Sequence, residues 1–128
     1  QPELQDQRPD WLANYIQWAE TMVRRNPCHS DMRMLYGNAL MWQALNAPGV
    51  DAPALMSKAE AEFEAMIRMS TISPQHRYAF AAALNRMAQY YGDMGKSGLA
   101  AAYAEKEREM VAQADELMLQ RQKSGLYP

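Results

Sequence analysis

Residues 84–100 read LNRMAQYYGDMGKSGLA, and this segment indicates two helices joined by a tight turn. Its side chains Leu84, Met87 and Tyr91 recur at the three- and four-residue spacing of one helix face. Gly95 then stands where a helix commonly ends on a residue with a left-handed backbone. Helical spacing resumes directly after this glycine, so we predict a helix, a turn and a second helix running back along the first.

Outward from this segment, the same spacing covers most of the chain and predicts five helices. Each start is marked by a capping side chain or a proline, which suits the first helical turn. The expected starts are Asp10, Ser30 or Asp31, Asp51, Ser73, and Lys96 or Ser97. No segment alternates apolar and polar residues for long enough to form a strand. The predicted fold class is therefore all-α, with about five antiparallel helices.

The expected organisation is an irregular lead-in over residues 1–9, a single all-α domain over 10–123 and a C-terminal tail over 124–128. A chain of 128 residues with 48% hydrophobic and 22% charged residues suits one globular domain. The net charge of −2 gives no basic excess for binding nucleic acid. No apolar run approaches the length of about 18 residues that a membrane-spanning helix needs, so we expect none.

The sequence begins with Gln1 and shows no charged and apolar leader segment. We therefore expect either a processed mature protein or a domain cut from a longer chain. The single cysteine, Cys28, suits an oxidising and a reducing compartment alike. The compartment stays open between periplasm and cytoplasm, and the mature-like start favours a bacterial envelope.

Residues 84–100 also resemble the tetratricopeptide repeat, a pair of antiparallel helices. In that pattern a large residue is followed by an apolar and small pair, an aromatic residue, a turn glycine and a small residue of the second helix. The residues at those positions are Leu84, Met87 with Ala88, Tyr91, Gly95 and Ala100. The small residues would let the two helices approach closely.

A second, degenerate repeat lies upstream and has a longer loop. The residues that fit it are Leu35, Ala39 and Trp42 in the first helix and Ala59 and Phe63 in the second. The resemblance covers roughly residues 32–112 and implies an array of helical hairpins. A compact helical bundle is the alternative.

The resemblance implies a protein or peptide partner and a role as adaptor, assembly factor or chaperone-like scaffold, as in bacterial secretion, pilus or envelope complexes. In the family, the first helix of each pair lines the concave binding face. The partner-binding residues carried over are Arg33, Tyr36, Gln43, Asn85, Arg86 and Gln89. We expect Asn85 and Gln89, four residues apart, to point out of the seam between their helix and the next, where both amides could bind one extended backbone. The charged clamp of the family is not reproduced.

No motif for catalysis or for a cofactor is found: the sequence has no Gly-rich phosphate loop and no GxSxG. His29 and His76 lack the spacing of metal ligands, and we interpret both as capping or solvated residues. The methionines follow the apolar stripes and are interpreted as core rather than as copper ligands. We therefore expect a non-enzymatic protein without a metal or another cofactor.

Trp11, Trp18 and Trp42 allow two interpretations. The first is that they fill the core between the first two helices, and the second is that they anchor a partner, because Trp is enriched at binding hot spots. Two alternative functions stay open: a structural subunit that self-associates into a homo-oligomer, and a small helical enzyme or ligand-binding bundle.

Overall fold

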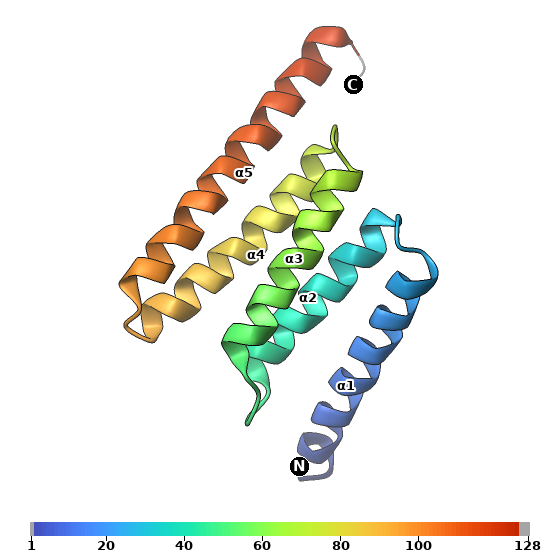
Figure 1. Ribbon diagram of the computed structural model, residues 1–128, viewed down its shortest axis with the longest axis vertical. Coiled ribbons are helices and arrows are strands. Elements are labelled where there is room, and N and C mark those ends of the chain that lie inside the picture. The colour runs from blue at the N-terminus through green and yellow to red at the C-terminus, as the bar shows by residue number, and fades with distance from the viewer. Residues whose placement is uncertain (1, 126–128) are drawn as a thin grey trace. The chain divides into compact units, whose positions relative to one another are not determined.

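The computed structural model describes residues 2–125, and the side chains of residues 11–125. The described chain forms five helices and contains no strand, which confirms the predicted all-α fold class (Figure 1). The helices are α1 (Pro2–Arg25), α2 (Ser30–Asn46), α3 (Ala52–Met69), α4 (Pro74–Asp93) and α5 (Ser97–Ser124).

The contacts divide the chain into two compact units, Gln1–Met69 and Ser70–Pro128. The first unit contains α1, α2 and α3, and the second contains α4 and α5. The division into two units does not test whether residues 10–123 form a single domain, so that expectation stays a prediction.

In the first unit, α2 and α3 form a closely packed pair (Figure 1). Phe63 of α3 is fully buried. A Cβ added at Gly37 of α2 would lie 3.0 Å from the Phe63 ring, so only glycine lets this ring approach the α2 backbone. The degenerate repeat placed Ala39 and Trp42 on the packed side. Ala39 is buried, but the placement of Trp42 is wrong, because its side chain is 48% exposed.

The helix α1 packs on the other side of α2, and less extensively than α3 does. It begins at Pro2, so the irregular lead-in expected over residues 1–9 is wrong from residue 2 onward. Proline suits the first helical position, where its missing N–H would have no partner in any case. Pro9 lies inside the helix, where proline normally removes a backbone hydrogen bond, and this is why the sequence indicated a boundary there.

The helix ends follow local chemistry. Ser73 caps α4 as predicted, with its hydroxyl accepting a hydrogen bond from the His76 backbone N–H at 3.2 Å. The cap of α2 is His29 rather than Ser30 or Asp31: the His29 Nδ1 accepts from the Met32 N–H at 3.3 Å. The capping interpretation of His29 is therefore confirmed.

The turn between α4 and α5 depends on Gly95, whose φ of +75° confirms the predicted left-handed residue. The Lys96 N–H donates to the Tyr91 carbonyl at 2.8 Å, and the Gly95 N–H donates to the Gly92 carbonyl at 3.0 Å. This pair of bonds is the Schellman arrangement, which satisfies carbonyls that the end of α4 would otherwise leave unpaired.

The second unit is held by the packing of α4 on α5 (Figure 1). Leu84 and Met87 are fully buried, and the ring of Tyr91 stacks on that of Tyr103 at 5.5 Å between centroids. Gly125 follows the last turn of α5 with φ +73°, and residues 126–128 of the predicted tail lie outside the described residues.

Candidate functional site

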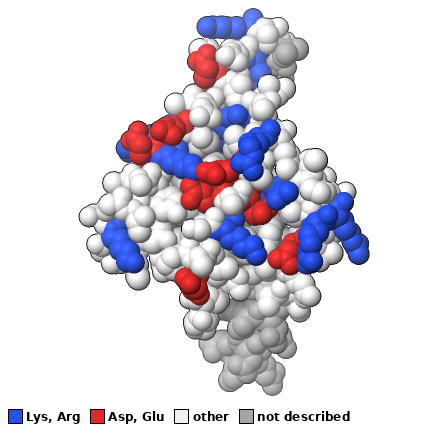
Figure 2. Space-filling model, viewed as in Figure 1, with Lys and Arg blue, Asp and Glu red and all other residues white. Residues whose placement is uncertain are grey.

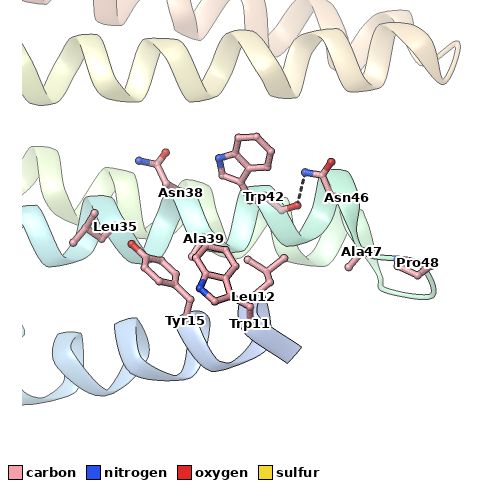
Figure 3. A pocket seen from close by; sticks show the side chains of 10 residues that line it. All are labelled: Trp11, Leu12, Tyr15, Leu35, Asn38, Ala39, Trp42, Asn46, Ala47 and Pro48. Atoms are coloured by element: carbon pink, nitrogen blue, oxygen red, sulfur yellow. Dashed lines mark hydrogen bonds between the residues drawn. The ribbon is translucent and has the colours of Figure 1, made fainter. Parts of the chain in front are cut away.

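A groove of about 780 Å³ lies between α1 and α2 of the first unit (Figure 3). The middle of α1 forms one side, and α2 with the start of the following loop forms the other. The lining residues are Trp11, Leu12, Tyr15, Leu35, Asn38, Ala39, Trp42, Asn46, Ala47 and Pro48. A volume of this size is typical of ligand sites, which span about 300–1,000 Å³.

Aromatic rings form the α1 side of the groove. The rings of Trp11 and Tyr15 stack at 5.7 Å between centroids, and those of Tyr15 and Trp18 approach to 5.8 Å. Tyr15 follows Trp11 by four residues and precedes Trp18 by three, which places the three rings along one face of the helix. The stack holds each ring in place, so the α1 side presents a preorganised apolar surface.

All three tryptophans are exposed: Trp11 is 67% exposed, Trp18 46% and Trp42 48%. The interpretation that they fill the core between the first two helices is therefore wrong. Trp11 and Trp42 line the groove from opposite helices, whereas Trp18 does not line it. The physical reason is that α1 and α2 leave a hollow at this end instead of closing on the rings.

The α2 side carries two amides and an indole in a row. Figure 3 shows Asn38, Trp42 and Asn46 along one edge of the helix, each four residues from the next. The Asn46 Nδ2 donates to the Trp42 carbonyl at 3.0 Å, and this bond fixes the direction of the Asn46 amide. Asn38 is half-buried, and its side chain makes no hydrogen bond with another described residue. The row therefore offers hydrogen-bonding groups on both sides of a large apolar ring.

None of the ten lining residues that the structure describes is charged. Elsewhere the charges are mixed: on the face shown in Figure 2, acidic and basic side chains lie interspersed. The described lining of the groove is thus uncharged and largely apolar and aromatic.

A separate polar cluster on the first unit contains two of the predicted partner-binding residues. Tyr36 is buried, and its hydroxyl donates to the Glu20 carboxylate at 2.8 Å. The Arg33 guanidinium pairs with Glu62 at 2.9 Å and also donates to the Pro27 carbonyl. Both side chains are thus engaged inside the unit.

The electrostatics of this cluster follow from its bonds. The hydrogen bond from Tyr36 lowers the pKa of the Glu20 carboxyl below its usual value, and the nearby cations of Arg24 and Lys58 act in the same direction. Burial raises the pKa of the Tyr36 hydroxyl. The hydrogen bond with Tyr36 raises the pKa of Lys58, whose ammonium lies 5.6 Å from the centre of that ring. The cluster therefore ties α1, α2 and α3 together.

The predicted residues of α4 are also engaged. The Asn85 Nδ2 donates to the Glu107 carboxylate of α5 at 3.3 Å, and the Gln89 Nε2 donates to the Asn85 Oδ1 at 2.9 Å. Asn85 was expected to point out of the seam between these helices. That expectation is wrong, because the glutamate of α5 draws the amide across the seam. Arg86 is exposed on α4, and Gln43 is half-buried on α2, outside the groove lining.

The α2 row of Asn38, Trp42 and Asn46 was not predicted from the sequence. A signal was present, since amide, indole and amide recur at four-residue spacing in one helix. Among the described residues, no group of three or more His, Cys, Asp or Glu side chains could hold a metal ion. No helix of the described chain is long and apolar enough to cross a membrane.

Comparisons of the chain with protein-family models, with curated proteins and with solved structures find no match.

Proposed function

We propose that this protein is a non-enzymatic protein-binding module whose groove between α1 and α2 holds a peptide segment of a partner. The observation that carries the proposal is the exposure of Trp11 and Trp42, which lie on different helices and both line a groove whose described lining is uncharged. Exposed tryptophans that face a common hollow are typical of binding hot spots, because a partner ring or aliphatic chain can be desolvated between them. The resemblance of residues 84–100 to the tetratricopeptide repeat agrees with an adaptor or assembly role.

The chemistry of the lining supports binding over catalysis. Apart from the hydroxyl of Tyr15, the ten lining side chains offer only amides, rings and aliphatic groups. Such groups stack and form hydrogen bonds, but they are weak acids, bases and nucleophiles. The carboxylates and cations of Glu20, Lys58, Arg33 and Glu62 are instead paired with one another in the polar cluster.

The test is a selection of peptides from a random displayed library on the intact chain, followed by titration of the labelled peptides. Trp42→Ala should weaken binding tenfold or more, roughly 1.4 kcal/mol. Trp18→Ala is the matched control, because Trp18 is exposed to nearly the same degree but does not line the groove. The control should change affinity less than about threefold, under 0.7 kcal/mol. If no peptide is selected, or if every selected peptide binds Trp42→Ala as well as the parent, the proposal fails.

A further inference from the structure

We infer that the connector between the two units, residues 70–73, is held on the second unit by a latch of two arginines and is not a free linker. The latch consists of Arg77 of α4 and Arg121 of α5. Both arginines belong, like the connector itself, to the unit Ser70–Pro128. The freedom of the chain to change direction between the units is therefore limited to the junction of Met69 and Ser70.

The side chains of the connector do little to hold it in place. The segment reads Ser-Thr-Ile-Ser, a composition typical of a loop. Thr71 is exposed, and Ile72 is 72% exposed, so the burial of these side chains contributes little. A segment with few buried apolar contacts opens readily unless its backbone is held by other groups.

The latch supplies those groups, because three of the four connector carbonyls accept hydrogen bonds from it. The Arg77 Nη1 donates to the Ser70 carbonyl at 2.9 Å and to the Ser73 carbonyl at 3.1 Å. Since both bonds come from one nitrogen atom, they bring the first and last carbonyls of the connector to the same point. The Arg121 Nη2 donates to the Ile72 carbonyl at 3.1 Å. The Ser73 N–H also donates to the Ser70 carbonyl at 3.2 Å, which closes the turn.

Arg77 is itself fixed, so it can serve as an anchor. It is buried, and its Nε donates to the Gln113 Oε1 of α5 at 3.1 Å. A buried cation is costly unless other groups replace its lost water. Among the described residues Arg77 pairs with no carboxylate, so the Gln113 amide and the connector carbonyls take that place. The connector therefore cannot leave without stranding a buried charge.

The downstream end of the connector is fixed as well. The Ser73 hydroxyl accepts from the His76 N–H at 3.2 Å, and the next residue, Pro74, is buried at the start of α4. The ring of a proline holds its φ near one value, so few degrees of freedom remain between the connector and the helix. The whole segment thus continues α4 as a fixed part of the second unit.

Hydrogen exchange of the backbone amides, followed by NMR on the intact chain, tests the latch. In the parent the Ser73 amide should be protected, because its N–H is bonded within the turn. Arg77→Met removes the bonds of Arg77 at a similar side-chain length and should speed the exchange of Ser73 by about tenfold or more. The amide of the fully buried Leu84 reports on the unit as a whole and should gain much less.

Arg25→Met is the matched control for the loss of an arginine. Arg25 is exposed on α1, and its side chain makes no hydrogen bond with another described residue. This variant should leave the exchange of Ser73 and of Leu84 within about twofold of the parent.

Arg121→Met tests the latch with a milder change, since it removes the Ile72 bond alone. Thermolysin cleaves before exposed apolar residues, so the bond between Thr71 and Ile72 is its expected site, and Arg121→Met should be cut there faster than the parent. A parent whose Ser73 amide exchanges like that of an unstructured peptide overturns the inference. Equal acceleration of Ser73 and Leu84 in Arg77→Met, or cleavage of Arg121→Met at the rate of the parent, would also overturn it.

Discussion

The two sides of α2 differ in how they are covered. Towards α3, Gly37 lets the buried Phe63 ring reach the α2 backbone, and the interface is closed. Towards α1, Trp11 and Trp42 stand on opposite helices, and a groove remains between them. The comparison shows that a glycine opposite a large buried ring lets one helix pair close, whereas exposed rings line a groove along the other pair.

The largest expected effect is on the closed side. Phe63→Ala should lower the free energy of unfolding by about 3–5 kcal/mol, because it removes a fully buried ring and leaves a cavity against α2. Trp42→Ala, on the open side, should cost less than about 1 kcal/mol, because nearly half of that side chain is already in water. Urea unfolding followed by circular dichroism measures both. Equal losses would abolish the distinction between the two sides.

A methyl group at Gly37 tests how tightly the closed side is packed. Gly37→Ala should destabilise the protein by about 1–3 kcal/mol through overpacking against the Phe63 ring. This loss should appear even though alanine is intrinsically better in a helix by about 1 kcal/mol.

Gly98→Ala is the matched control for this change. Gly98 lies in α5, where an added Cβ would have no other atom within 4 Å, so the substitution should be neutral or stabilising by up to about 1 kcal/mol. A Gly37→Ala variant that gains stability as Gly98→Ala does would mean that Phe63 can move aside freely.

The smallest effect concerns the polar cluster that joins both sides of α2. Because the folded state lowers the pKa of Glu20, chiefly through the Tyr36 hydrogen bond, this carboxylate stabilises the fold above its unfolded pKa of about 4.5. That contribution is lost as the pH falls through the lower folded pKa. The parent should therefore exceed Glu20→Gln in stability at neutral pH, and the difference should shrink at about pH 3.

Urea unfolding at the two pH values measures this effect. Glu109→Gln, on an exposed position of α5, is the control for loss of one carboxylate, and it should show a smaller change between the two pH values. A Glu20→Gln difference that grows on acidification would contradict the assigned role of the Tyr36 bond.

The parts of the fold that local chemistry determines could be predicted from the sequence. Ser73 caps α4 because a hydroxyl before proline suits a helix start, and Gly95 takes a positive φ that other residues avoid. The boundary predicted at Pro9 is wrong. A proline inside a helix usually costs stability, but α1 begins at Pro2 and continues through Pro9.

The site was harder to predict because α2 is apolar on more than one face. Leu35, Ala39 and Trp42 share one stripe, while Tyr36 and Leu40 share another that is buried. Both stripes have helical spacing, and only the position of the neighbouring helices decides which is covered. The prediction placed the Trp42 stripe against a neighbouring helix. It therefore missed the row formed by the exposed Trp42 and the amides of Asn38 and Asn46.

The order of the helices has a consequence for how fast the chain folds. Every helix pair described in contact consists of consecutive helices: α1 with α2, α2 with α3, and α4 with α5. Each pairing closes only a short loop, so little chain entropy is lost before contacts form. Helical proteins whose contacts are this local fold in about microseconds to milliseconds, and the contacts within each unit are of this kind. The Schellman turn at Gly95 favours the reversal of the chain, so the hairpin of α4 and α5 can start from its turn.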